Sequence, residues 1–163
     1  GRPPATQPAT QQTEQQTTDN GTGAPVHSEA PRVMPVGGPV TYEYGWLPKG
    51  KQPHEGLDLA AKVGDPVVAM AEGTVLRVGT DDLAGALVEV DHGFAVVTYG
   101  QVTAARVKAG DHVQQGQRLA DVAKPTGKEG DTGAHLHLEV RPARGAKPID
   151  PAPYLPLNGG SDS

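Results

Sequence analysis

The chain contains no cysteine and few aromatic residues. Its 163 residues include one Trp, one Phe and four Tyr, 4% in all. Without cysteine there can be neither a disulfide bond nor a thiolate ligand. Any metal ion bound by this chain must therefore be held by nitrogen and oxygen atoms. The lack of cysteine leaves the cellular compartment open.

Long apolar runs and blocks of basic residues are also missing. The sequence has no run of 18 apolar residues, so it predicts no transmembrane helix. A net charge of -5 with no basic block argues against nucleic acid as a partner. The length suits one domain with a substantial core and is too short for two domains of that size.

Glycine and proline, by contrast, are abundant, at 22 and 16 residues. This composition favours many short strands and tight turns over long helices, and hence an all-β fold with little helix. Runs rich in Val, Leu and Thr, bounded by Gly, Asp or Pro, predict strands. The predicted strands cover residues 40–44, 66–70, 73–80, 86–91 and 95–99.

The first 31 residues differ in composition from the rest. They are rich in Gln, Thr, Pro and Gly and have scarcely any large apolar side chain, so we expect a disordered tail or linker over 1–31. The folded domain is expected over 32–157, followed by a frayed tail over 158–163. Because the sequence begins with Gly1, we interpret it as a processed chain or a cut fragment, and a signal or anchor segment could have been lost with the missing part.

The stretch 133–140 alternates polar and apolar residues, which is typical of a half-buried strand. Its apolar residues would face a core: Leu136, Leu138 and Val140. His135, His137 and Glu139 would then share the opposite face. Two imidazoles on one strand face can converge on a metal ion, although a solvated strand face with two ordinary histidines would show the same pattern.

A second group of candidate ligands lies about eighty residues upstream. Pro53 and Gly56 disfavour a helix here, so His54 is placed at the end of a loop and Asp58 at the start of a strand. Together with His137 they offer two imidazoles and one carboxylate. This set suits Zn²⁺ with a fourth position open for water, as in catalytic zinc sites. His135 beside it could exchange a proton with that water.

These motifs occur in a recognisable order. His-x-x-x-Asp at 54–58 precedes His-Leu-His at 135–137, and four further segments lie between them: 64–67, 71–75, 90–93 and 110–117. In this the chain resembles, from about residue 33 to residue 155, the LytM/lysostaphin-type zinc endopeptidases, which cleave peptide cross-links in bacterial cell walls. The resemblance implies a small antiparallel β-sheet fold, a barrel-sandwich hybrid, with zinc at the floor of an open groove.

The resemblance also implies roles for individual residues. His54, Asp58 and His137 would be the zinc ligands, and His135 would be a catalytic acid/base. The substrate would be peptidoglycan peptides, and the domain would lie outside the cytoplasm, in the cell wall or on a membrane anchor. A membrane would be involved only through a missing N-terminal anchor.

One position departs from the family pattern. The family usually has Tyr-x-His-Leu after the turn at 92–93, and its His is the second catalytic imidazole, but here the sequence is Tyr99-Gly100-Gln101-Val102. Glutamine can donate a hydrogen bond to an oxyanion but cannot carry a proton at neutral pH. A positioned acid/base typically contributes about 10²–10⁴-fold to the rate. We therefore expect a site that binds metal and turns over slowly or not at all.

Two features make the chain similar to one branch of this family, that of sporulation stage II protein Q: the Gln at position 101, and Trp46 directly after Tyr44-Gly45. The resemblance implies that the domain acts largely through a partner protein, as members of that branch do. Three interpretations remain open. The chain is a zinc endopeptidase with His135 as base and Gln101 as hydrogen-bond donor, or a non-hydrolytic scaffold of a cell-wall or sporulation complex that keeps its zinc. The third is a plain β module without metal.

Five other residues receive more limited predictions. Glu139 either orients a ligand from behind or pairs with a nearby Arg. His92 is expected to make a structural hydrogen bond, with a groove-lining role as the alternative, and His112 is expected to lie on the surface. Tyr99 is expected to be packed in the interior, with a substrate contact as the alternative. Trp46 is either a groove wall or a core residue.

Overall fold

The computed structural model describes residues 32–46, 54–125 and 133–156. The predicted tail over 1–31 and the final tail over 158–163 lie outside these residues. None of the described residues forms a helix long and apolar enough to cross a membrane.

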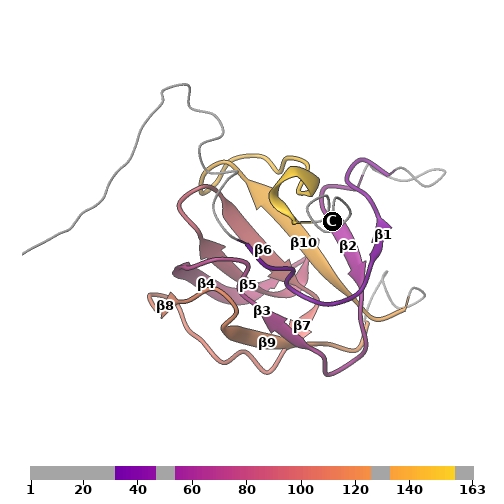
Figure 1. Cartoon of the computed structure of the whole chain (residues 1–163), viewed down its shortest axis with the longest axis horizontal. Coiled ribbons are helices and arrows are strands. Elements are labelled where there is room, and N and C mark those ends of the chain that lie inside the picture. Colours follow the sequence, from indigo (N-terminus) through magenta and orange to yellow (C-terminus); the bar gives the residue numbers. More distant parts are fainter. Residues whose placement is uncertain (1–31, 47–53, 126–132, 157–163) are drawn as a thin grey trace, which may run out of the picture. The chain divides into compact units, whose positions relative to one another are not determined.

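Seven of the described strands form the larger sheet, in the order β1-β2-β10-β6-β5-β4-β8, and every pairing in it is antiparallel (Figure 1). The strands are β1 (Val40–Tyr42), β2 (Leu57–Ala60), β10 (His135–Arg141), β6 (Val96–Gly100), β5 (Gly85–Asp91), β4 (Gly73–Asp81) and β8 (His112–Val113). The last strand of the chain, β10, is thus inserted between β2 and β6, and this places residues far apart in sequence side by side.

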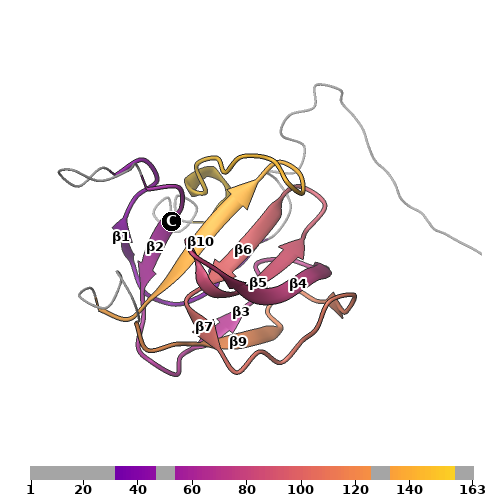
Figure 2. The ribbon, with the colours of Figure 1, turned by 180° about the vertical axis from the view of Figure 1, so that it is seen from behind.

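Three short strands form a second antiparallel sheet, in the order β3-β9-β7. They are β3 (Pro66–Val68), β9 (Arg118–Val122) and β7 (Val102–Thr103). In both ribbon views this small sheet lies against one side of the larger one (Figure 2). A 3-10 turn, η3 (Ala152–Tyr154), is the helical element among the described residues. The predicted all-β antiparallel fold with little helix is confirmed.

The core lies between the two sheets and follows from the alternation of side chains along the strands. The larger sheet contributes Leu57 and Leu59 from β2 and the apolar residues of β10, all 1% exposed or less. The small sheet contributes Val67 and Leu119, which are fully buried in the same cluster. Full burial of each such side chain stabilises the fold by about 1.5–3 kcal/mol. This core holds β2 and β10 in fixed register.

Buried polar contacts join Tyr99 on β6 to the segment that follows β3 and to His92. The hydroxyl of Tyr99 accepts a hydrogen bond from the backbone N–H of Met70 at 3.0 Å and lies 2.8 Å from Nε2 of His92. The other ring nitrogen, Nδ1 of His92, is 2.9 Å from the carbonyl of Glu72. Burial lowers the pKa of His92 and raises that of Tyr99. The structural role predicted for His92 and the interior position predicted for Tyr99 are both confirmed.

The predicted strand limits agree closely with the structure in three places and are too long in two. The strands predicted over 73–80, 86–91 and 95–99 each lie within one residue of β4, β5 and β6. The one predicted over 66–70 ends at Val68, because the backbone N–H of Met70 turns to the Tyr99 hydroxyl. The one predicted over 40–44 ends at Tyr42.

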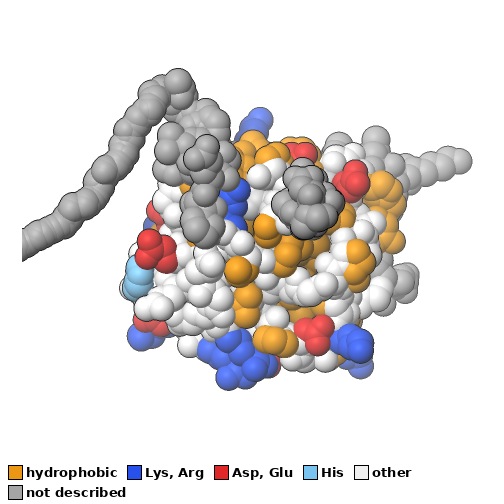
Figure 3. Space-filling model, in the orientation of Figure 1, with side chains coloured by type: hydrophobic (Ala, Val, Ile, Leu, Met, Phe, Trp, Pro, Cys, Tyr) orange, Lys and Arg blue, Asp and Glu red, His pale blue; other side chains and the backbone are white. Residues whose placement is uncertain are grey.

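The surface carries charged side chains of both signs, which lie around the edge of the face drawn in Figure 3, with hydrophobic side chains nearer its centre. Trp46 is 46% exposed and packs against Tyr42, with ring centroids 4.4 Å apart. It is therefore not a core residue. His112 is exposed, as predicted.

Candidate metal centre

The candidate site is built on the pairing of β2 with β10. In this antiparallel pair Asp58 and His137 are directly opposite each other, so their side chains leave the sheet on the same face. His54 precedes β2, and its backbone is tied to the turn that follows β1, since its N–H donates to the carbonyl of Trp46 at 2.9 Å. The predicted placement of His54 in a loop and Asp58 in a strand is confirmed.

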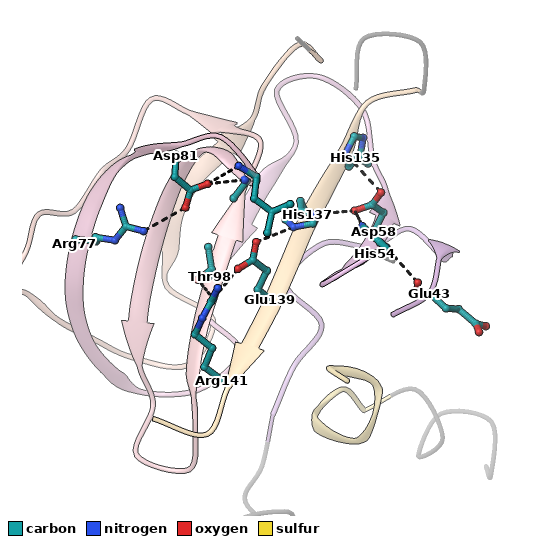
Figure 4. Close-up of polar contacts among 12 residues, drawn as sticks. Glu43, His54, Asp58, Arg77, Asp81, Thr98, His135, His137, Glu139 and Arg141 are labelled. Carbon is teal, nitrogen blue, oxygen red and sulfur yellow. Dashed lines mark hydrogen bonds and ion pairs between the residues drawn. The ribbon is translucent and has the colours of Figure 1, made fainter. Parts of the chain in front are cut away.

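Three side chains converge at this point (Figure 4). Oδ1 of Asp58 lies 3.0 Å from Nδ1 of His137 and 3.4 Å from Nε2 of His54. One nitrogen or oxygen atom from each of the three residues falls within 4.8 Å of the others. Two imidazole nitrogens and one carboxylate oxygen form a donor set that zinc prefers. These residues could therefore hold a metal ion.

Each imidazole at the site is oriented by a contact of its other ring nitrogen. Nδ1 of His54 is 3.2 Å from the carbonyl of Glu43, and Nδ1 of His135 is 2.9 Å from the carbonyl of Gly133. Nε2 of His137 is 3.0 Å from Oε2 of Glu139. A carbonyl or carboxylate oxygen accepts an N–H, so the opposite nitrogen of each ring points toward Asp58. Nε2 of His54 is buried and makes no hydrogen bond to any described residue.

The charges at the site are closely coupled. Burial would raise the pKa of Asp58, but the hydrogen bond with His137 and the 3.4 Å contact with His54 outweigh it and hold this pKa well below its ordinary range. Burial would lower the pKa of His137, but the carboxylates of Asp58 and Glu139 raise it to about 9. His137 thus carries a positive charge between two carboxylates. A metal cation bound at Nδ1 would take the place of the proton on that nitrogen. The surroundings of His137 therefore suit a cation.

His135 lies beside the three converging residues. Its Nε2 is 3.8 Å from Oδ2 of Asp58, and the side chain is 4% exposed. The prediction that β10 would be half-buried is wrong, because its polar face is buried as well: Glu139 is 1% and His137 is 3% exposed. The physical reason is that these polar side chains pair with Asp58 and Arg141 and so need no solvent.

The backbone of Gln101 lies next to the cross-strand partner of a candidate ligand. It directly follows β6, whose last residue, Gly100, is the partner of His137 across β6 and β10. Its φ of 63° places it in the left-handed region, which is uncommon for a residue with a side chain. The amide is buried against Gly85, where a Cβ would lie 2.8 Å from Nε2 of Gln101. The catalytic role predicted for Gln101 stays a prediction.

Two features of the site were not predicted from the sequence as functional. The carbonyl of Glu43 orients His54, and nothing in the side-chain pattern indicates this. Gly56 packs against the ring of His137: a Cβ there would lie 2.8 Å from its Cε1 and 2.7 Å from the carbonyl of Leu138. The sequence did offer one signal for this packing, a glycine midway between His54 and Asp58.

Residues 52–151 match the family model of Peptidase family M23, over more than half of the chain. The chain belongs to peptidase family M23. Among curated relatives, the lipoprotein NlpD/LppB homolog of Pseudomonas aeruginosa is 33% identical over 132 residues, which cover 74% of this chain and 42% of the relative. Peptidoglycan DD-endopeptidase ShyA of Vibrio cholerae is 36% identical, over 54% of this chain and 20% of its own length.

Other relatives bear names that are not those of peptidases. The murein hydrolase activator EnvC of Escherichia coli is 32% identical, over 83% of this chain and 30% of its own length. Stage II sporulation protein Q of Bacillus subtilis is 37% identical, over 53% of this chain and 31% of its own length. This chain spans less than half the length of each of these relatives.

Solved structures of M23 peptidases share the fold. A zinc containing peptidase from Vibrio cholerae is 31% identical with a TM-score of 0.59, over 71% of this chain and 37% of that chain. The catalytic domain of the antimicrobial peptidase lysostaphin from Staphylococcus simulans is 26% identical with a TM-score of 0.60, over 71% of this chain and 90% of that chain. The resemblance to the LytM/lysostaphin type found in the sequence is confirmed.

Proposed function

We propose that this M23 domain is a zinc metalloendopeptidase that acts on the peptide cross-links of peptidoglycan. The observation that carries the proposal is the convergence of His54 Nε2, Asp58 Oδ1 and His137 Nδ1 beside the ring of His135. The names of two relatives support the substrate class and the metal: ShyA is a peptidoglycan DD-endopeptidase, and a similar solved structure is that of a zinc containing peptidase.

In this proposal the chain's own residues have distinct tasks. His54, Asp58 and His137 hold zinc, which when bound supplies a Lewis acid that polarises the scissile carbonyl. His135 takes a proton from the attacking water through Nε2 and passes it to the leaving amine. Its Nδ1 contact with the Gly133 carbonyl keeps Nε2 directed at the site. Gln101 donates an amide hydrogen bond to the oxyanion that develops on the substrate.

Gln101 itself favours a second candidate function. With no proton to transfer at this position, the domain would bind zinc and wall peptides without cleaving them, as a scaffold that acts on a protein partner. The relatives EnvC, a murein hydrolase activator, and stage II sporulation protein Q support this alternative. Such a partner would belong to a cell-wall or sporulation complex.

We also propose that the domain lies outside the cytoplasm, where peptidoglycan is. One relative is a lipoprotein homolog, another is a peptidoglycan DD-endopeptidase, and a third is a murein hydrolase activator. In this arrangement residues 1–31 tether the domain over 32–157 to the cell envelope.

The deciding experiment compares wild type, Gln101→His and Asp58→Asn, each zinc-loaded, on purified cell walls and on oligoglycine peptides. Newly exposed amino groups and products resolved by mass spectrometry report cleavage. We expect slow cleavage by wild type, none by Asp58→Asn, and a rate about 10²–10⁴-fold higher for Gln101→His.

Two other outcomes would change the conclusion. Cleavage by Gln101→His with none by wild type would favour the scaffold function. No cleavage by either protein, with zinc bound to both, would contradict the endopeptidase proposal.

A further inference from the structure

A carboxylate lies immediately behind the candidate metal ligand on β10. Oε2 of Glu139 is 3.0 Å from Nε2 of His137, on the side of the ring away from Asp58. Oε1 of the same carboxylate is 2.6 Å from Nη1 of Arg141. Figure 4 shows the three side chains in succession along β10. Glu139 therefore links a histidine of the metal centre to a cation that is not part of it.

This carboxylate is held in one orientation. Both of its oxygens are engaged, so it cannot rotate without breaking the contact with His137 or the contact with Arg141. Arg141 in turn reaches Oγ1 of Thr98 on β6 at 3.4 Å. Glu139 is 1% exposed, and a carboxylate so deeply buried is stable only when it is paired. The arginine supplies that pairing and leaves Oε2 as a fixed acceptor.

A fixed acceptor decides which nitrogen of an imidazole is available for a ligand. A ring whose Nε2–H donates to Glu139 presents the lone pair of Nδ1, and Nδ1 is the atom that faces Asp58 and His54. We propose that Glu139, held by Arg141, is a positioning residue that fixes the tautomer and orientation of His137 for metal binding. This inference rests on the proposed function, since it concerns the same metal centre.

The same sheet offers a matched comparison. Glu89 on β5 and Glu139 on β10 are both cross-strand partners of Thr98, so they lie in one row on one face of the sheet. Glu89 is also buried, at 7% exposed, and is also ion-paired with an arginine, Arg77, at 3.5 Å. Among the contacts of the described residues, Glu89 is paired with Arg77 and not with a candidate ligand. Glu89→Ala thus removes a buried glutamate and its ion pair with Arg77, at a position away from the candidate ligands.

The test measures zinc affinity by competition with a chromogenic chelator, for wild type, Glu139→Ala, Glu139→Gln and Glu89→Ala, after metal removal. We expect Glu139→Ala to bind zinc about 10–100-fold more weakly than wild type, as is typical when the partner of a ligating histidine is lost. Glu139→Gln keeps an oxygen acceptor, so its zinc affinity should lie between those of wild type and Glu139→Ala. Glu89→Ala should bind zinc like wild type. Cobalt(II) absorption spectra of each protein report ligand geometry separately from affinity.

Each outcome supports or overturns the inference. Wild-type zinc affinity and cobalt spectrum in Glu139→Ala, or an equal loss of affinity in Glu89→Ala, would overturn it while leaving the proposed metal centre intact. If Glu139→Ala does not fold, Glu139→Gln decides alone, and an unchanged cobalt spectrum with unchanged affinity would count against the inference. Failure of the wild type to bind zinc would overturn the proposed metal centre and this inference with it.

Discussion

Asp58 and His137 are 79 residues apart in the sequence, yet they are direct cross-strand partners with Oδ1 and Nδ1 3.0 Å apart. Both side chains are almost completely buried, at 4% and 3% exposure. The contact joins the His-x-x-x-Asp segment to the His-Leu-His strand through the pairing of β2 with β10, two interior strands of the larger sheet. Several consequences can be measured.

Replacing Asp58 by Asn removes the only carboxylate among the three converging residues while keeping the size of the side chain. We expect Asp58→Asn to weaken zinc binding by more than about 100-fold. This exceeds the loss expected when a residue that only hydrogen-bonds to a metal ligand is replaced. Chelator competition measures this. Asp121→Asn is the control, because Asp121 is ion-paired with Arg118 on the small sheet. Unchanged zinc affinity in Asp58→Asn would contradict the proposed ligand set.

Replacing His135 should separate catalysis from metal binding. Its Nε2 faces the site, but His135 is not one of the three residues that converge to ligand distance. In whichever background cleaves cell walls, wild type or Gln101→His, we expect His135→Ala to lower the rate by about 10²–10⁴-fold. Zinc affinity should change little. His112→Ala, at an exposed position on β8, should have no effect on either quantity. A large loss of zinc in His135→Ala would argue that this residue is a ligand.

Gly56 is predicted to be indispensable for the shape of the site. A methyl group there would lie 2.8 Å from Cε1 of His137 and 2.7 Å from the backbone carbonyl of Leu138, so the ring would have to move. We expect Gly56→Ala to lower the free energy of unfolding by about 1–3 kcal/mol and to weaken zinc binding. Gly37→Ala is the matched control, since no atom lies within 4 Å of its Cβ position. Equal stability and zinc affinity in the two variants would show that the ring tolerates the methyl group.

The stability of the metal-free protein should fall as the pH rises above neutrality. The pKa of His137 is raised from 6.5 to about 9 in the folded protein, chiefly by Asp58 and Glu139 against the effect of burial. A raised pKa means that folding favours the protonated form, so its contribution is complete below 6.5 and is lost as the pH passes through about 9. We expect a loss on the order of 3 kcal/mol in the free energy of unfolding.

Urea denaturation in the presence of a chelator, at about pH 6 and about pH 9.5, measures this change. His137→Gln should show a much smaller dependence on pH over the same interval. A free energy of unfolding that stays constant across this interval in the wild type would contradict the assigned charge on His137.

Much of the fold was predictable because strand signals in this chain are local. The runs at 73–80, 86–91 and 95–99 alternate or are rich in β-branched residues, and they end at Gly and Asp turns, so their limits were found within one residue. The segment 66–70 was predicted too long, because its end depends on the hydroxyl of Tyr99, some thirty residues later in the chain. A contact of that kind leaves no trace in local sequence.

The candidate ligands were also predictable as residue types. His54, Asp58 and His137 stood out through their motif spacing, and the structure brings them together. The two interpretations considered for Glu139, a ligand partner or an Arg partner, both describe contacts that exist, because the carboxylate has two oxygens and each serves one of them.

The sequence alone determined the all-β character of the chain and the placement of its main strands, since these depend on composition and on side-chain periodicity, and its motif spacing singled out the candidate ligands. Only the tertiary structure decided that β10 lies between β2 and β6, that the polar face of β10 is buried, and which ring nitrogen each histidine directs at Asp58. Strand order and tautomer depend on partners from distant parts of the chain, which meet only when the core between the sheets has packed.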